Sequence, residues 1–199
     1  HADGAVTLDE KLSHCAAIAM NTTIPVSVDF EDGFSNEPSE VATNIRRLAE
    51  TGVAGCSIED YSRVEQKIFD FNHAVERMQA AAEAVRALDI EFQLIARAEN
   101  LLRKHADFDD TLKRLQEFSK AGAHVLYAPG LTTLDQIKQV VAHTDKPLNV
   151  LSPFLPNETL QSLSDAGATR ISLGSALQLK MRSKFVEEIE DLMSSGRAS

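Results

Sequence analysis

The chain has 199 residues and carries 20 Lys and Arg against 30 Asp and Glu, which gives a formal net charge of −10 at pH 7. Hydrophobic residues make up 43% and charged residues 25%, as in a globular protein with an apolar core, which argues against a chain disordered throughout. An acidic balance without a basic cluster repels phosphate backbones, so nucleic acid is not an expected partner. The apolar runs fall far short of the roughly 20 residues that span a bilayer, so no membrane segment is expected.

The length of the chain and its two cysteines indicate how many domains to expect and in which redox setting the protein folds. At roughly 100–200 residues per domain, the sequence predicts one domain over residues 1–199. Residues 1–4 lack Met and resemble the end of a loop, so we expect the natural N-terminal segment to be missing. Cys15 and Cys56 have neither disulfide-framework nor metal-site spacing, which predicts a reduced, cytoplasmic setting.

Helical and strand patterns alternate along the chain. Thr7 with Glu10, and later Thr133 with Gln136, have the spacing of capping boxes that open helices. Short, nearly continuous apolar runs rich in β-branched residues predict strands buried on both faces. In chain order the predicted elements are helix 7–21, strand 25–30, helix 38–50, strand 53–58, helix 69–88, strand 92–98, helix 109–120, strand 124–128, helix 133–143, strand 148–151, helix 157–166, strand 169–173 and helix 176–193.

Six alternations of strand and helix predict an α/β fold with a parallel sheet and right-handed crossovers. A (β/α)8 TIM-type barrel has eight strands and is usually about 250 residues long. We therefore expect such a barrel lacking its first two strands in this chain. An open doubly wound sheet, which six units could also build, is the alternative.

Charged residues gather where the first three strands end, and active residues of such folds lie at the carboxyl ends of strands. Alternation along a strand predicts that Asp29 and Glu31 share one face, and that Arg97 and Glu99 share another. The carboxylates of Asp29, Glu31 and Glu59 should converge at neighbouring strand ends, with nothing basic immediately beside them. Because like charges repel, such a cluster requires a bound cation. Mg²⁺, which takes one or two carboxylates and keeps several waters, is the best match, and Mn²⁺ is an alternative.

Other polar residues of the sequence could either bind substrate or have a structural role. Arg97 could bind a substrate carboxylate with its planar fork. Asn149 and Ser152 end the fifth strand and could touch substrate, although a turn role is equally open. The acids themselves could instead cap helices or pair with lysines at the rim of the sheet.

Five segments together carry a family resemblance: 28–33, 52–60, 95–100, 125–130 and 171–176. In order and spacing they resemble the isocitrate lyase / phosphoenolpyruvate mutase superfamily over nearly the whole chain. The resemblance implies a (β/α)8 barrel whose last helix is commonly swapped between subunits, giving a homodimer or homotetramer. It also implies Mg²⁺-dependent chemistry on small 2-oxo or 2-hydroxy carboxylic acids, in which a C–C or P–C bond is made or broken through an enolate.

The same resemblance implies roles for individual residues. Asp29 matches the acid nearest the metal, Glu31 takes the place of a second acid that is usually Asp, and Glu59 matches the third metal-shell carboxylate. Arg97 matches the substrate-binding arginine and is expected to take part in catalysis. Asp3 matches a catalytic aspartate on the loop after the second barrel strand.

The loop after Glu59 departs from the best-known members. The lyases carry a Lys-Lys/Arg-Cys-Gly motif there, whereas residues 60–69 contain no cysteine, and the phosphonopyruvate enzymes carry a longer loop. The branch lacking this motif is therefore favoured, with a decarboxylase or aldol-type C–C lyase acting on an oxaloacetate-like acid. Alternatives are a phosphoenolpyruvate phosphonomutase or phosphonopyruvate hydrolase, a phosphate-binding barrel isomerase or aldolase that uses Gly174 and Ser175, and a non-catalytic barrel.

Overall fold

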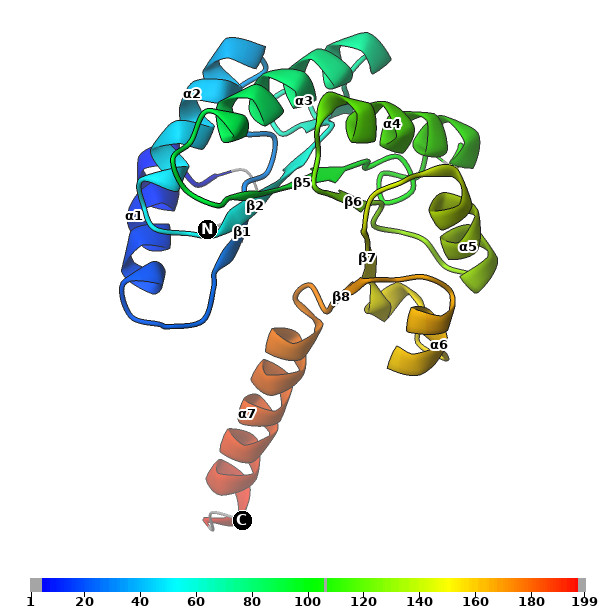
Figure 1. The fold of residues 1–199 in the computed structure, drawn as a ribbon. Coiled ribbons are helices and arrows are strands. Elements are labelled where there is room, and N and C mark those ends of the chain that lie inside the picture. The colour runs from blue at the N-terminus through cyan, green and yellow to red at the C-terminus, as the bar shows by residue number, and fades with distance from the viewer. Residues whose placement is uncertain (1–4, 106, 197–199) are drawn as a thin grey trace.

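Six parallel strands form one curved sheet in the computed structural model, which describes residues 5–105 and 107–196 (Figure 1). The strands are β1 (Ser27–Asp29), β2 (Gly55–Glu59), β5 (Gln93–Arg97), β6 (Val125–Tyr127), β7 (Leu148–Leu151) and β8 (Arg170–Ser172). They are hydrogen-bonded in the order β1-β2-β5-β6-β7-β8, all parallel. A doubly wound sheet reverses its strand order at a switch point, and this order never reverses. The expected part of a TIM-type barrel is therefore confirmed over the open alternative.

Helices alternate with the strands, and all but the last cover the outer face of the arch (Figure 1). They are α1 (Leu8–Ala19), α2 (Pro38–Ala49), α3 (Phe71–Arg86), α4 (Phe108–Ala121), α5 (Leu134–His143), α6 (Leu160–Asp165) and α7 (Ala176–Ser195). Both predicted capping boxes are present, Thr7 with Glu10 and Thr133 with Gln136. These caps satisfy backbone N–H groups that the first helical turn leaves without partners.

The core lies between the sheet and the helices outside it. Val41, Ile45 and Leu48 recur at helical spacing on α2 and are fully buried. They belong to the same core cluster as Leu94 of β5, which is also fully buried. The outer layer thus holds the sheet by apolar burial and leaves the strand ends free to carry polar side chains.

Two short elements were not predicted. Residues 61–68, expected as a loop, form an antiparallel hairpin of β3 (Tyr61–Ser62) and β4 (Lys67–Ile68). Its strands are too short to show the period-2 pattern on which strand prediction depends. A 3₁₀ turn, η1 (Ser152–Phe154), follows β7 directly.

The last helix stands apart from the arch. None of the residues of α7 is buried, and Figure 1 shows the helix projecting away from the sheet. Its exposed apolar side chains are Leu177, Leu179, Met181, Phe185, Val186, Ile189, Leu192 and Met193. Exchange of this helix between subunits stays a prediction. Over the described residues, no helix combines the length and the apolar character needed to cross a membrane.

Candidate active site

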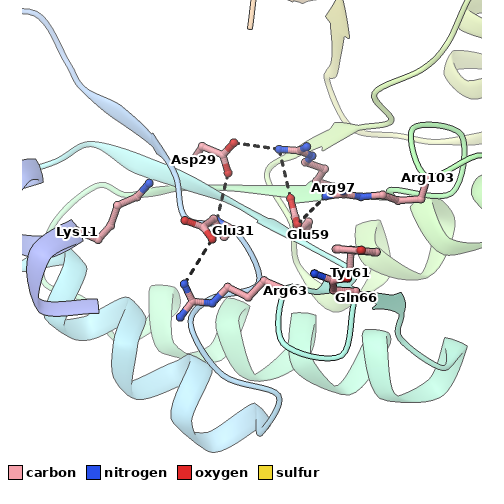
Figure 2. Close-up of a pocket in the computed structure, with 9 residues that line it drawn as sticks. All are labelled: Lys11, Asp29, Glu31, Glu59, Tyr61, Arg63, Gln66, Arg97 and Arg103. Carbon is pink, nitrogen blue, oxygen red and sulfur yellow. Dashed lines mark hydrogen bonds and ion pairs between the residues drawn. The ribbon is translucent and has the colours of Figure 1, made fainter. Parts of the chain in front are cut away.

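A cavity of about 320 Å³ opens at the carboxyl ends of β1, β2 and β5 (Figure 2). It brings together four residues singled out from the sequence: Asp29, Glu31, Glu59 and Arg97. Its lining is completed by Lys11, Tyr61, Arg63, Gln66 and Arg103. The volume lies at the lower end of the range for small-molecule sites, so it suits a small ligand.

Asp29 and Glu31 reach the same cavity through a turn. β1 ends at Asp29, and Glu31 has φ 49°, a left-handed conformation that strands do not adopt. The backbone N–H of Glu31 donates to Oδ1 of Asp29 at 3.2 Å. Asp29 and Glu31 therefore do face the same side, as predicted, but a turn after β1 brings them together and strand alternation does not. The side chain of Asp29 remains 61% exposed and accessible from the cavity.

Arg97 is the centre of an ion-pair network (Figure 2). Its Nη1 lies 3.1 Å from Oδ2 of Asp29 and 3.4 Å from Oε2 of Glu59, and its Nε donates to Glu99. Burial alone would lower the pKa of Arg97, but the carboxylates of Glu99, Glu59 and Asp29 outweigh it and raise that pKa. Arg97 is therefore fixed as a permanent cation beside Asp29.

Among the acids that line the cavity, Glu59 has the most strongly shifted pKa. Its side chain is only 7% exposed, at the end of β2. Burial, followed by the charge of Glu99, raises the pKa of Glu59 to about 8, although Arg97 and Arg103 act in the opposite direction. Its carboxyl group therefore takes up a proton more readily than that of an exposed glutamate, unless further positive charge approaches it.

The expectation that nothing basic lies beside the acids is wrong. Besides Arg97, Arg63 places Nη1 3.5 Å from Oε2 of Glu31, and Arg103 places Nη2 3.5 Å from Oε1 of Glu59. Sequence reasoning considered only the strand ends, whereas Arg63 lies in the unpredicted hairpin. Arg103 is four residues after Glu99 and contacts it at 2.9 Å, a spacing that could have revealed it.

Aromatic rings fix these two arginines. The guanidinium carbon of Arg63 lies 4.0 Å from the ring centroid of Phe34, and that of Arg103 lies 3.7 Å from the ring of Tyr61. Arg63 also donates to the carbonyl oxygen of Val6 at 3.0 Å. Stacking and hydrogen bonding hold both side chains in defined positions at the edge of the cavity.

The remaining predicted site residues lie elsewhere. Asn149 is 3% exposed and donates from Nδ2 to Oγ of Ser172 at 3.0 Å, while its Oδ1 has no hydrogen-bond partner in the described structure. Ser152 begins η1, and neither Asn149 nor Ser152 is among the residues that line the cavity. Asp3 lies outside the described residues.

The donor chemistry of the cavity suits a hard divalent cation. In residues 5–105 and 107–196, no three Asp, Glu, His or Cys side chains form a group that could hold a metal directly. The acids that face the cavity nevertheless supply only oxygen donors, and burial raises the pKa of Glu59, so that an added cation would favour its charged form. Asp29, as the exposed acid, fits a direct contact, while Glu31 and Glu59 fit contacts through water, which is how Mg²⁺ is usually held.

Comparison with known proteins identifies the family. The family model described as phosphoenolpyruvate phosphomutase matches residues 1–193. A protein of solved structure from Burkholderia cenocepacia J2315, named only in general terms as a lyase/mutase, is 38% identical, with a TM-score of 0.91 over 97% of this chain and 70% of that chain. The uncharacterized protein Rv1998c of Mycobacterium tuberculosis H37Rv is 32% identical over 151 residues, which are 75% of this chain and 54% of the relative.

Two relatives of named activity match less closely. The 2-methylisocitrate lyase of Escherichia coli K12 is 28% identical over 152 residues, covering 73% of this chain and 50% of that protein. The oxaloacetate decarboxylase of Pseudomonas entomophila is 28% identical over 158 residues, covering 76% of this chain and 53% of that protein. The chain thus spans about half the length of the curated relatives it matches. The family match over residues 1–193 confirms the resemblance seen in the sequence, and the chain belongs to the phosphoenolpyruvate phosphomutase family, within the isocitrate lyase / phosphoenolpyruvate mutase superfamily.

Proposed function

We propose that the chain is part of a Mg²⁺-dependent lyase that cleaves a C–C bond of a small 2-oxo or 2-hydroxy carboxylic acid, with an oxaloacetate-like acid favoured. The observation that carries this proposal is the joint presence of Asp29, Glu31 and Glu59 beside Arg97 in one small cavity. Relatives named 2-methylisocitrate lyase and oxaloacetate decarboxylase support the same class of reaction. Mn²⁺ is the alternative cation.

The residues of the site have separable tasks in such a reaction. Cleavage beside a 2-oxo group leaves negative charge on the enolate oxygen, and a bound Mg²⁺ would supply the electrostatic stabilisation of that charge. Asp29 would hold the cation, and Glu31 and Glu59 would orient its water. Arg97, held by three carboxylates, adds a fixed positive charge next to Asp29 and would face a substrate carboxylate.

The β3–β4 hairpin is the feature by which we choose between cleavage of a C–C bond and cleavage of a P–C bond. Residues 61–68 form a compact β3–β4 turn whose Arg63 contacts Glu31 and Asp32. It lacks the cysteine of the lyase motif and the length of the phosphonopyruvate loop. A decarboxylase or aldol-type lyase is therefore preferred, and phosphoenolpyruvate phosphonomutase or phosphonopyruvate hydrolase activity is the second candidate.

Calorimetric titration with oxalate, with and without Mg²⁺, tests the proposal, because oxalate mimics a planar pyruvate enolate. We expect binding that requires Mg²⁺ and falls at least about 100-fold in Asp29→Asn, since the exposed acid that holds the cation is lost. Asp89→Asn, an exposed acid outside the cavity, is the matched control. Mg²⁺-independent binding, or an unaffected Asp29→Asn variant, would favour the phosphate-binding or non-catalytic barrel instead.

A substrate screen then separates the chemistries. Wild-type protein is incubated with oxaloacetate, 2-methylisocitrate and phosphonopyruvate in the presence of Mg²⁺, and pyruvate and inorganic phosphate are measured. Release of pyruvate without phosphate supports a C–C lyase. Release of phosphate from phosphonopyruvate, as by a hydrolase, or its conversion to phosphoenolpyruvate, as by a phosphonomutase and measured in the same reactions, supports the second candidate.

A further inference from the structure

Four cationic side chains line the cavity, and three of them already form ion pairs with carboxylates of the protein. Each of Arg63, Arg97 and Arg103 contacts at least two carboxylates within 4.0 Å. A guanidinium that is held in this way has fewer N–H groups left for a further ligand than a cation without protein partners. Lys11 differs, because its ammonium group has no hydrogen bond or ion pair with any residue that the structure describes.

The position of Lys11 is nonetheless well defined. It lies in the first turns of α1, and the helix begins at the capping box of Thr7 and Glu10. Asp9 pairs with Arg47 of α2 at 2.6 Å, and Cys15 anchors the helix in the core at 3% exposure. Its side chain is half-buried and extends toward Asp29 and Glu31, whereas Arg103 lies across the cavity (Figure 2). The charge of Lys11 is thus held at the α1 side of the acid cluster.

We propose that Lys11 binds the distal anionic group of the substrate and so determines preference for acids that carry a second negative charge. This inference rests on the proposed function, in which the 2-oxo or 2-hydroxy carboxylate end lies at Asp29 and Arg97. A ligand bound there that extends toward α1 would meet Lys11, a cation that forms no ion pair with a carboxylate of the described residues. A charge-assisted hydrogen bond in a partly enclosed cavity is strong enough to select one ligand over another.

Malate and its 4-methyl ester provide a direct test, because the ester replaces the negative charge of the distal group by a neutral methyl ester, and a purely steric effect of the added methyl group would persist without Lys11. Oxalate serves as the reference ligand, since it fills only the head of the site. With Mg²⁺ present, we expect wild-type protein to bind malate about 10- to 100-fold more tightly than the ester in calorimetric titrations. In Lys11→Met, which keeps the apolar stem, this preference should disappear while oxalate affinity stays within about 2-fold of wild type.

Two further variants complete the test. Lys11→Arg should retain the preference for malate, because it keeps a cation at this place. Lys138→Met, at an exposed position of α5, is the matched control and should behave as wild type. A wild-type protein without the preference, a Lys11→Met variant that keeps it, or a Lys11→Met variant that loses oxalate binding as well would each overturn the inference. Loss of Mg²⁺-dependent oxalate binding in the wild type would instead contradict the proposed function itself.

Discussion

Arg97 and Glu99, two residues apart at the end of β5, form an ion pair in which the side chain of Glu99 has no exposed surface and that of Arg97 is 12% exposed. Glu99 also accepts from Nε of Arg103 at 2.9 Å. One buried carboxylate therefore positions the two arginines that face Glu59 from different backbone segments. Fixing the arginines in this way determines where positive charge lies in the cavity before any ligand binds.

Replacement of Glu99 by Gln should destabilise the fold. The substitution keeps the volume but removes the charge that compensates Arg97 and Arg103, and breaking a buried pair on one side costs about 3–5 kcal/mol. Urea denaturation gives the change in the free energy of unfolding, with the exposed Glu91→Gln as control. A loss below about 1 kcal/mol would show that the network does not depend on this charge.

Much of this site follows from the sequence, because its residues lie at strand ends. Asp29, Glu59 and Arg97 each follow a continuous apolar run, and the period-2 rule placed Arg97 and Glu99 together. Asp29 and Glu31 also face one cavity, but the left-handed turn at Glu31 is invisible to that rule.

The features that sequence reasoning missed depend on tertiary contacts. The hairpin has strands of only two residues each, and Arg63 reaches Glu31 across 32 positions of sequence. Long-range pairs of this kind leave no periodic pattern in the chain. Asn149, predicted at a strand end, lies inside β7, and its contact with Ser172 comes from the pairing of β7 with β8.

Glu59 should make stability depend on pH in the absence of divalent cations. Its pKa is about 8 in the folded chain against 4.5 for the free group, so the folded state binds this proton more tightly. The resulting stabilisation is complete below pH 4.5 and is lost as pH rises through about 8. The Glu59→Gln variant cannot titrate here. The free energy of unfolding of wild type minus that of Glu59→Gln should therefore fall between these pH values.

Urea titrations across this range measure that difference. Adding Mg²⁺ should reduce the pH dependence in wild type, because a cation near Glu59 favours its charged form. Parallel curves for the two proteins would mean that Glu59 is already ionised in the folded chain.

Gly55 should be intolerant of any side chain. It opens β2 opposite Gln93 of β5, and a Cβ atom there would lie 2.9 Å from Cβ of Gln93 and closer still to its carbonyl oxygen. The two strands would have to separate, so Gly55→Ala should cost about 1–3 kcal/mol. Thermal unfolding checks this expectation, and an unchanged midpoint would mean that the sheet adjusts without loss.

Arg77 should couple the stability of the outer layer to the turn that carries Glu31. This residue of α3 is 1% exposed, and burial lowers its pKa to about 10. Its guanidinium donates to the carbonyl oxygens of Asp32, Ser35 and Glu59 and stacks 4.0 Å from the ring centroid of Phe69. The backbone of the turn that carries Glu31, and the end of β2, are thus held from behind by one side chain.

Replacement of Arg77 by Met leaves three carbonyl oxygens without this donor, and each unsatisfied buried group costs about 1–3 kcal/mol. We expect a loss of about 3–5 kcal/mol in the free energy of unfolding. Hydrogen exchange should accelerate first in residues 30–36, because their anchor is gone. Arg86→Met, near the exposed end of the same helix, is the control. Uniform acceleration over the whole chain would show that Arg77 stabilises the fold without holding this turn in particular.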